Sequence, residues 1–208
     1  MAVTKRRPLD RRRILETAVR FVDREGLTAL SMRKLGAELG VEAMSLYNHV
    51  PNKEALLDGM VEVILGELEV PPRGEDWEKR VKEAYRAFRR LAHEHPNVFP
   101  LLVTRPPDTM DGVWLVEEFL KTLRAAGFGP ETALHAFRTL SSYATGYSMA
   151  EIRGFAMEPV EAHLGARSLS AAEFPNISEL GNYLEDVDRD AEFEFGLDLI
   201  LSGLREKL

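Results

Sequence analysis

The fold is indicated most clearly by the stretch TALSMRKLGAELGVEAMSLYNHVPNK, residues 28–53. Its pattern predicts two short helices joined by a tight turn. Ser31 is placed to cap the first helix, and Gly40 ends it, because glycine adopts a left-handed C-terminal conformation without a steric penalty. The apolar residues of this first helix recur at helical intervals: Met32, Leu35 and Leu39.

The second helix of this stretch carries an outward surface suited to nucleic acid. Val41 fills the corner before it, and Leu46 and Val50 are expected to face inward, one turn apart. The side chains left on the outer side are small, polar or aromatic, with few charges: Ala43, Met44, Ser45, Tyr47, Asn48 and His49. A helix surface of this kind fits base edges and phosphates in a DNA major groove, so we predict that these six residues contact DNA.

The segments on either side make the pattern more specific, because a helix, a glycine turn and a helix alone describe many helical corners. Residues 10–26 make a preceding amphipathic helix, and LYNHVPNKEALL, residues 46–57, closes the unit. Together, residues 10–60 resemble the TetR family of bacterial transcriptional regulators. The resemblance implies that Arg33 and Lys53 also touch DNA. An ordinary helical corner remains the alternative.

The carboxyl half resembles the tetracycline-repressor branch of that family through VTRP (103–106), AAGF (125–128) and FGLDLILSGL (195–204). The resemblance implies an all-α fold. A three-helix helix-turn-helix domain would occupy residues 1–52. A helical bundle that binds an effector and dimerises would occupy residues 53–208.

The effector expected from this resemblance is metal-free. In tetracycline-binding relatives a metal-coordinating histidine lies three residues before Thr-Arg-Pro, and here that position is Leu101. Glu69 stands where those relatives place another ligand-contacting histidine. We therefore expect no metal and no other cofactor.

The charge distribution also indicates a nucleic-acid partner at one end of the chain. The net charge of −7 argues against one, but residues 1–53 hold 11 Lys and Arg against 6 Asp and Glu. Residues 54–208 hold 16 against 28. A basic head on an acidic body is expected when only the head meets phosphate.

The termini and composition favour a cytoplasmic protein without a membrane partner. There is no cysteine, which excludes disulfides, thiol catalysis and thiolate metal sites. There is no apolar run of 18 residues and no apolar signal core. Residues 1–8 carry Lys5, Arg6 and Arg7 and form either an arm that neutralises phosphates or a solvated tail.

The body is predicted to be helical. Helices are expected at 53–69, 77–94, 111–126, 130 to about 155 and 188–204, with a short helix or turn at 96–103. Residues 158–187 read as a long loop with one short helix. Between positions 132 and 150 the helix from Pro130 has Arg138 as its only charged residue and His135 as its only histidine, so we expect it to be buried on most sides.

The last helix has two apolar faces. Phe193, Leu197, Ile200 and Leu204 lie on one face, and Ala191, Phe195, Leu199 and Ser202 lie on the other. Such a helix needs two partners, and a second copy of the chain is the simplest second one. This predicts a homodimer; a helix sunk in its own core is the alternative.

No catalytic or metal-binding constellation is evident. His93 and His95 point roughly 200° apart on a helix. Gly146-Tyr-Ser-Met-Ala150 half resembles a nucleophile elbow but lies within a continuous helix, and Glu117 and Glu118 are adjacent rather than facing. We therefore predict no enzyme and read the histidines as polar residues at a helix end.

The body offers apolar and aromatic side chains with scattered hydroxyls. Each alone fits core packing better than ligand contact, but together they are suited to line an apolar effector site. The ligand-binding candidates are Phe88, Phe99, Leu102, Thr104, Met110, Trp114, Phe137, Tyr143 and Tyr147.

These observations predict a sequence-specific transcriptional regulator. The favoured form is a homodimeric repressor on double-stranded DNA, released from a palindromic operator by an apolar small-molecule effector. An activator or a ligand-blind repressor is a variant. The alternative class is an all-helical enzyme or carrier for an apolar small molecule, whose basic head binds protein. Salt-dependent, sequence-selective DNA binding distinguishes the two classes.

Overall fold

Helices account for all the regular secondary structure in the part of the chain that the structure, a computed structural model, describes. That part comprises residues 8–72, 76–105, 110–154, 170, 172–179 and 187–208. The all-α prediction is confirmed. The chain divides by packing into two units, Met1–Leu123 and Arg124–Leu208. The functional boundary after residue 52 falls inside the first unit and stays a prediction.

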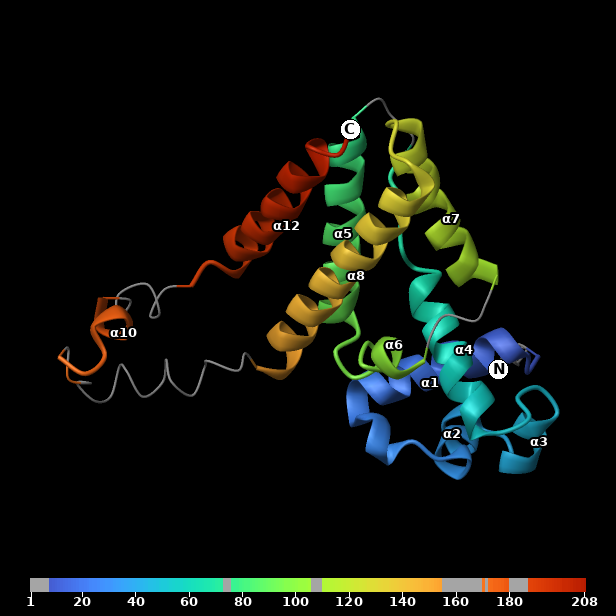
Figure 1. Cartoon of the computed structure of the whole chain (residues 1–208). Coiled ribbons are helices and arrows are strands. Elements are labelled where there is room, and N and C mark those ends of the chain that lie inside the picture. The colour runs from blue at the N-terminus through green and yellow to red at the C-terminus, as the bar shows by residue number, and fades with distance from the viewer. Residues whose placement is uncertain (1–7, 73–75, 106–109, 155–169, 171, 180–186) are drawn as a thin grey trace, which may run out of the picture. The chain divides into compact units, whose positions relative to one another are not determined.

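The helices of Figure 1 agree closely with the predicted ones. The helix predicted at 77–94 has the same bounds in the structure. The helix predicted at 53–69 begins at Lys53 as predicted but ends earlier, at Leu65. In chain order the helices are α1 (Arg11–Glu25), η1 (Leu27–Ala29), α2 (Met32–Leu39), α3 (Ala43–Tyr47), α4 (Lys53–Leu65), α5 (Trp77–Glu94), α6 (Leu101–Thr104), α7 (Met110–Ala125), α8 (Pro130–Arg153), α10 (Pro175–Glu179) and α12 (Arg189–Arg205).

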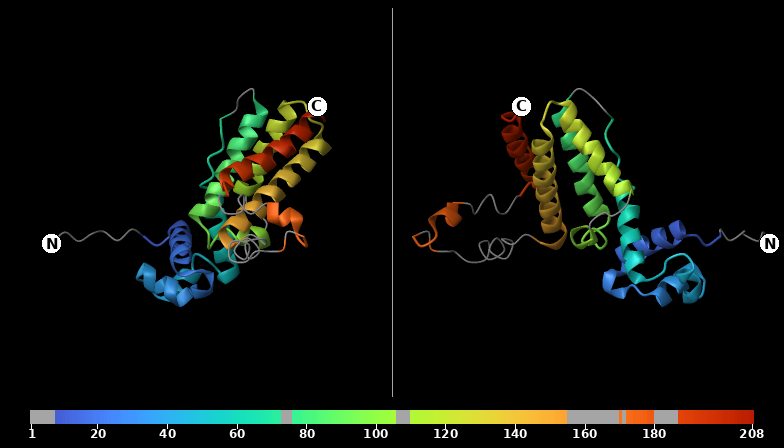
Figure 2. Two further views of the ribbon diagram at one scale, coloured as in Figure 1. Left: turned by 90° about the vertical axis from the view of Figure 1, so that its left-hand side faces the viewer. Right: turned by 45° about the vertical axis from the view of Figure 1, so that its right-hand side comes forward.

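The first unit is built around α1 and α4. Figure 2 shows the blue helices α1, α2 and α3 gathered at one end of α4. Ile14 of α1 and Met60 of α4 are fully buried between them. Gly59 permits the close approach, because a Cβ there would lie 2.5 Å from a methyl carbon of Leu15.

The core of the head continues beyond residue 52. The hydrophobic cluster that holds the buried residues of α1 to α4 also includes Leu91 of α5, Val98 between α5 and α6, and Leu101 of α6. The helices that follow the predicted boundary are therefore packed directly against the helix-turn-helix.

The second unit pairs α8 with α12 (Figure 1). Tyr143 of α8 stacks on the fully buried Phe193 of α12, with 5.6 Å between ring centroids. Gly196 lies directly against the same tyrosine, since a Cβ at that position would be 2.1 Å from its hydroxyl oxygen. A side chain larger than hydrogen at position 196 would force the two helices apart.

The prediction that α8 is buried on most sides is wrong for the single chain. One stripe is buried, and other positions, including His135, Arg138 and Ser142, are exposed. The prediction took the low number of charged residues in this helix as a sign of burial. Small Ala and Ser side chains are also found in contact with solvent. The buried residues follow helical spacing: Ala133, Ala136, Leu140, Ala144 and Ser148.

The long loop and the basic arm are described only in part. The short helix expected within residues 158–187 is present as α10. The arm residues Lys5, Arg6 and Arg7 lie outside the described residues. Within the described ranges, no helix combines the length and the apolarity that crossing a bilayer requires.

Candidate functional site

The caps of α2 are those that the sequence predicts. The Ser31 hydroxyl accepts a hydrogen bond from the Lys34 amide at 3.3 Å, as an N-cap does. Gly40 ends the helix in the left-handed conformation with φ 68°. The amide of Val41 then donates to the carbonyl of Gly36 at 2.9 Å, which closes the turn into α3.

Gly36 is a determinant of this turn that the sequence reasoning missed. A Cβ at this position would lie 2.9 Å from the Val41 carbonyl oxygen and 3.2 Å from the Ala43 nitrogen, both backbone atoms. The two helices can therefore meet only over a glycine. The signal in the sequence was a glycine inside a helix, where it costs about 1 kcal/mol relative to alanine.

α3 is shorter than predicted. It ends at Tyr47, and Asn48 and His49 lie in a turn in which the amides of residues 49 and 50 donate to the Leu46 carbonyl at 3.0 and 2.9 Å. Pro51 disfavours the helical conformation at Val50, which shortens the helix. Leu46 and Val50 are nonetheless buried, as predicted.

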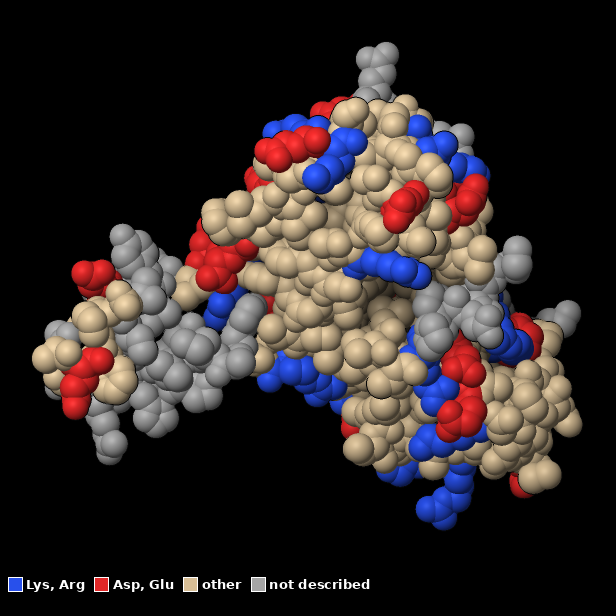
Figure 3. All heavy atoms as spheres, in the orientation of Figure 1, with Lys and Arg blue, Asp and Glu red and all other residues tan. Residues whose placement is uncertain are grey.

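The predicted DNA-contacting side chains lie on the outer side of α3 and in the turn after it. Met44 is 72% exposed and Tyr47 is 42% exposed. Asn48 and His49 are exposed, and Ala43 and Ser45 are half-buried. In Figure 3 the surface over α3 is mostly uncharged, and basic side chains project from the first unit beside α2.

The basic side chains of the head fall into two groups. Arg11 pairs with Glu62 at 2.7 Å, and Arg24 pairs with Glu25 at 2.9 Å and with Glu38 at 3.2 Å. By contrast, within the described residues no ion pair engages the three exposed cations nearest α3: Arg33, Lys34 and Lys53. Their charges are available to phosphate. Lys34 was not among the predicted residues.

α4 starts directly after this surface and is held at its first turn. The Asn52 side chain accepts a hydrogen bond from the Ala55 amide at 2.8 Å, which caps the helix. Arg105, which follows α6, donates to Asp58 at 2.5 Å and pairs with Glu54. Arg105 therefore links the end of α6 to the helix that begins at Lys53.

A second polar junction holds the other end of α4. His95, the C-cap of α5, has Nδ1 2.6 Å from Asp23 Oδ2 of α1 and Nε2 2.9 Å from Glu67 Oε2, just past α4. Burial lowers the pKa of His95, but the hydrogen bonds with the two carboxylates outweigh it and raise that pKa above its ordinary value. The helix-end position of His95 was predicted, but the carboxylates around it were not.

The effector candidates of the first unit differ in exposure. Phe99 is fully buried and packs edge-on against Phe88, with 5.2 Å between ring centroids. Leu102 is half-buried, and Thr104, with its hydroxyl 3.3 Å from the Leu101 carbonyl, is exposed. Trp114 is exposed on α7. The side chain of Met110 lies outside the described residues. The effector assignment of all six residues stays a prediction.

The effector candidates of the second unit take part in packing α8 on α12. The Tyr143 hydroxyl donates to the Phe193 carbonyl at 2.9 Å. The Tyr147 hydroxyl donates to the Arg189 carbonyl at 3.0 Å. Phe137 is half-buried. Both tyrosine hydroxyls therefore hold this helix pair together, whatever contact they make with a ligand.

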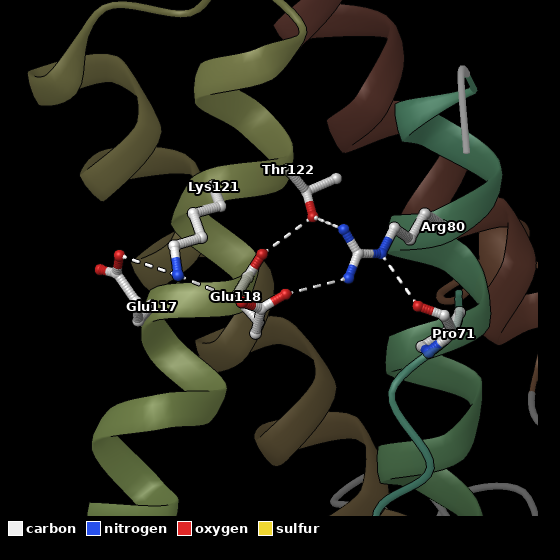
Figure 4. A network of polar contacts seen from close by, with 6 residues as sticks. All are labelled: Pro71, Arg80, Glu117, Glu118, Lys121 and Thr122. Carbon is white, nitrogen blue, oxygen red and sulfur yellow. Dashed lines mark hydrogen bonds and ion pairs between the residues drawn. The ribbon is translucent and has the colours of Figure 1, made fainter. Parts of the chain in front are cut away.

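A buried polar network in the first unit was also missed. Arg80 of α5 donates to the Thr122 hydroxyl at 2.7 Å and to the Pro71 carbonyl at 3.1 Å, and lies 3.5 Å from Glu118 of α7 (Figure 4). Glu117, its sequence neighbour, is exposed and pairs with Lys121 at 3.4 Å. One of two adjacent glutamates is thus a structural ion-pair partner, and the network ties α5 to α7.

Comparisons with known proteins agree with this architecture. The family model described as "Bacterial regulatory proteins, tetR family" matches residues 14–60, and that described as "Tetracyclin repressor-like, C-terminal domain" matches residues 70–208. An HTH-type transcriptional regulator of Saccharopolyspora erythraea is 32% identical over 200 residues, covering 92% of this chain and 83% of that protein. The tetracycline repressor protein class G of Vibrio anguillarum is 30% identical over 199 residues, covering 94% and 93%.

Among solved structures, the TetR family protein ActR of Streptomyces coelicolor in complex with actinorhodin superposes with a TM-score of 0.83. It is 35% identical to this chain, and the match covers 96% of this chain and 98% of ActR. The exposed α3 surface, the basic residues beside it and the helical body thus occur in a chain that belongs to the TetR family of bacterial regulatory proteins and is a DNA-binding transcriptional regulator.

Proposed function

We propose that the protein is a homodimeric repressor that leaves a palindromic operator when a metal-free small molecule binds its body. The observation that supports this most directly is the surface of α3. It exposes Met44, Tyr47, Asn48 and His49 between cations that make no ion pair in the described part of the chain. Base edges are read by such side chains, while free cations neutralise phosphates.

The proposed dimer rests on α12. Its buried face includes Phe193, Leu197 and Leu201, while Phe195 and Leu199 on the other side are 67% and 60% exposed. Two large apolar side chains one turn apart form a surface that a second copy would cover through a two-fold contact. A two-fold dimer presents two recognition helices to two half-sites, which is the reason for proposing a palindrome.

The effector is proposed to bind without a metal. Leu101 stands at the position of a metal-coordinating histidine in the tetracycline branch, and here its side chain is buried in the hydrophobic core. An apolar side chain in that core offers no ligand atom. A largely apolar compound with one or two hydrogen-bonding groups fits the candidate lining best, because burying an unpaired charge is costly.

Release is proposed to pass through α6 and α4. Arg105 joins the end of α6 to the first turn of α4, and Leu101 of α6 shares a core with the helix-turn-helix. An effector that prefers a different position of α6 therefore shifts α4 and the α3 surface before it. Typical couplings of about 1–3 kcal/mol change DNA affinity about 5- to 150-fold. In this proposal the protein acts by binding, without catalysis.

DNA binding is tested with the purified protein and the DNA upstream of its own gene. We expect one protected site with two related half-sites, and an affinity that falls steeply as salt rises. Equal affinity for that DNA and for a random duplex of the same length would refute sequence-selective repression and favour the carrier.

The effector is tested by thermal shift with ring-containing apolar compounds, including actinorhodin and magnesium-tetracycline. The expected ligand raises Tm and releases the operator equally with and without EDTA. A shift produced only by magnesium-tetracycline, and abolished by EDTA, would show that Leu101 does not exclude a metal-dependent effector.

A further inference from the structure

Three metal-ligating side chains meet where α4 and α5 end. Glu67, Glu94 and His95 each place one ligand atom so that all three atoms lie within 4.8 Å of one another. We infer that these residues bind one divalent transition-metal ion, through His95 Nε2 and one carboxylate oxygen from each glutamate. None of these three residues is among the predicted DNA contacts or effector candidates, although the amide of the candidate Phe99 donates to the His95 carbonyl at 2.8 Å.

The ligand set fits an ion such as Zn²⁺. One imidazole nitrogen and two carboxylate oxygens are ligands that Zn²⁺ accepts at about 2.0–2.2 Å, and a water completes a tetrahedral site with three protein ligands. Donors around such an ion are separated by about 3–3.5 Å, given those bond lengths. His95 Nε2 and Glu67 Oε2 are 2.9 Å apart, so these two atoms need to move apart by only about 0.1–0.6 Å to reach the donor spacing around the ion. Both glutamates are exposed, which leaves a path for the ion and its water.

Asp23 supplies the outer support that such a site requires. Its Oδ2 lies 2.6 Å from His95 Nδ1 and accepts the hydrogen on Nδ1. Nε2, which donates to Glu67 Oε2 at 2.9 Å, would release its hydrogen when the ion binds and offer its lone pair to the ion. A histidine that binds a metal almost always donates its other ring nitrogen in this way, often to a carboxylate. The Asn97 amide donates to the Asp23 carbonyl at 3.1 Å, which ties the backbone of Asp23 to the segment after α5.

The charge around His95 also favours a cation. Three carboxyl groups surround one imidazole: Asp23, Glu67 and Glu94. Within the described residues, Oδ1 of Asp23 is buried without a hydrogen-bond partner. A protonated imidazole alone would offset one of these negative charges. A divalent ion offsets two.

Binding of the ion would connect the segment after α4 to the end of α5. Glu67 follows α4, Glu94 ends α5, and Asp23 reaches the same histidine from α1. The connection would lie beside α1, whose Asp23 contacts His95. Ions that bind the folded chain and not the unfolded one raise Tm with their concentration.

The test is Zn²⁺ titration of the untagged full-length protein after EDTA treatment and dialysis, without DNA or effector. Calorimetry should give one ion per chain. We expect Glu67→Gln and Glu94→Gln each to weaken binding by about tenfold or more, and Asp23→Asn to weaken it by about 10- to 100-fold. His93→Gln and Glu69→Gln, which change neighbouring groups outside the three, should bind like the wild type.

Substitution with Co²⁺ gives a second measurement, because its visible absorption reports the coordination geometry. Glu94 is exposed at the helix end, so Glu94→Gln should keep the fold even where a change at His95 does not. The inference is overturned if the wild type binds no Zn²⁺ stoichiometrically, or if Glu94→Gln and the wild type bind with equal affinity. Either result leaves the proposed repressor function unaffected.

Discussion

Arg105, directly after α6, donates a hydrogen bond to Asp58 on α4 at 2.5 Å. The same guanidinium pairs with Glu54 one turn earlier. Its side chain is mostly buried, while both carboxylates are largely exposed. The contact joins two helices that lie far apart in the sequence, and one of them begins directly after the surface predicted to contact DNA.

Arg105→Gln is expected to uncouple effector from operator more than it unfolds the protein. Pairs with exposed carboxylates contribute about 1 kcal/mol or less to stability, so Tm should change little. The factor by which effector weakens operator binding should fall, because α6 no longer holds α4. Arg12→Gln breaks the pair with Glu16 within α1 and serves as the control. An unchanged effector response in Arg105→Gln would show that coupling runs elsewhere.

Lys53→Ala and Asn48→Ala should affect DNA binding in different ways. Lys53 is expected to neutralise a phosphate, so its loss should weaken all duplexes alike and reduce the salt slope by about one. Asn48 is expected to read a base, so its loss should cost about 1–3 kcal/mol on the operator and relax preference at one base pair. Competition binding on specific and random duplexes measures both. Equal losses on the two duplexes for Asn48→Ala would refute its role in readout.

Leu199→Glu should produce monomers with poor operator affinity. A carboxylate at the centre of an apolar interface is desolvated without a partner, which disfavours association. Light scattering gives the mass, and gel shift gives the affinity. Leu208→Glu is a matched control, because Leu208 is 61% exposed but lies beyond α12. A Leu199→Glu protein that stays dimeric would place the interface on another surface.

Glu118→Gln should destabilise the first unit, whereas Glu117→Gln should not. Arg80 and Glu118 are a buried pair, and removing one partner leaves the other charge without compensation, at a cost of about 3 kcal/mol. Glu117 is exposed and pairs with Lys121, so its contribution is small. Urea unfolding of the two variants gives the comparison. Equal stability would mean that Thr122 and Pro71 suffice to hold the guanidinium.

Gly196→Ala should loosen the α8–α12 pair. The new methyl group would overlap the ring of Tyr143, and overpacking of this kind costs about 1–3 kcal/mol. Gly203→Ala on the same helix meets no atom within 4 Å and should stabilise by up to about 1 kcal/mol through helix propensity. Thermal unfolding distinguishes them. A Gly196→Ala protein as stable as Gly203→Ala would show that Tyr143 moves aside freely.

The local elements were predictable because their causes are local. Ser31, Gly40 and Asn52 act on backbone groups within three or four residues, so the helix ends they define follow from spacing alone. The inward positions of Leu46 and Val50 follow from periodicity in the same way. The early end of α3 depends on Pro51, whose effect on the preceding residue was underestimated.

What the sequence by itself determined is therefore the all-helical fold, the caps of its helices and the outward position of the α3 side chains predicted to contact DNA. Only the tertiary structure decided which distant residues meet: Arg105 with Asp58, Glu118 rather than Glu117 with Arg80, and His95 with Asp23 and Glu67. Helix periodicity states which face a residue occupies, but not which helix covers that face. That choice depends on how whole helices pack. Even the short-range approach of α3 to α2 over Gly36 is set by this packing.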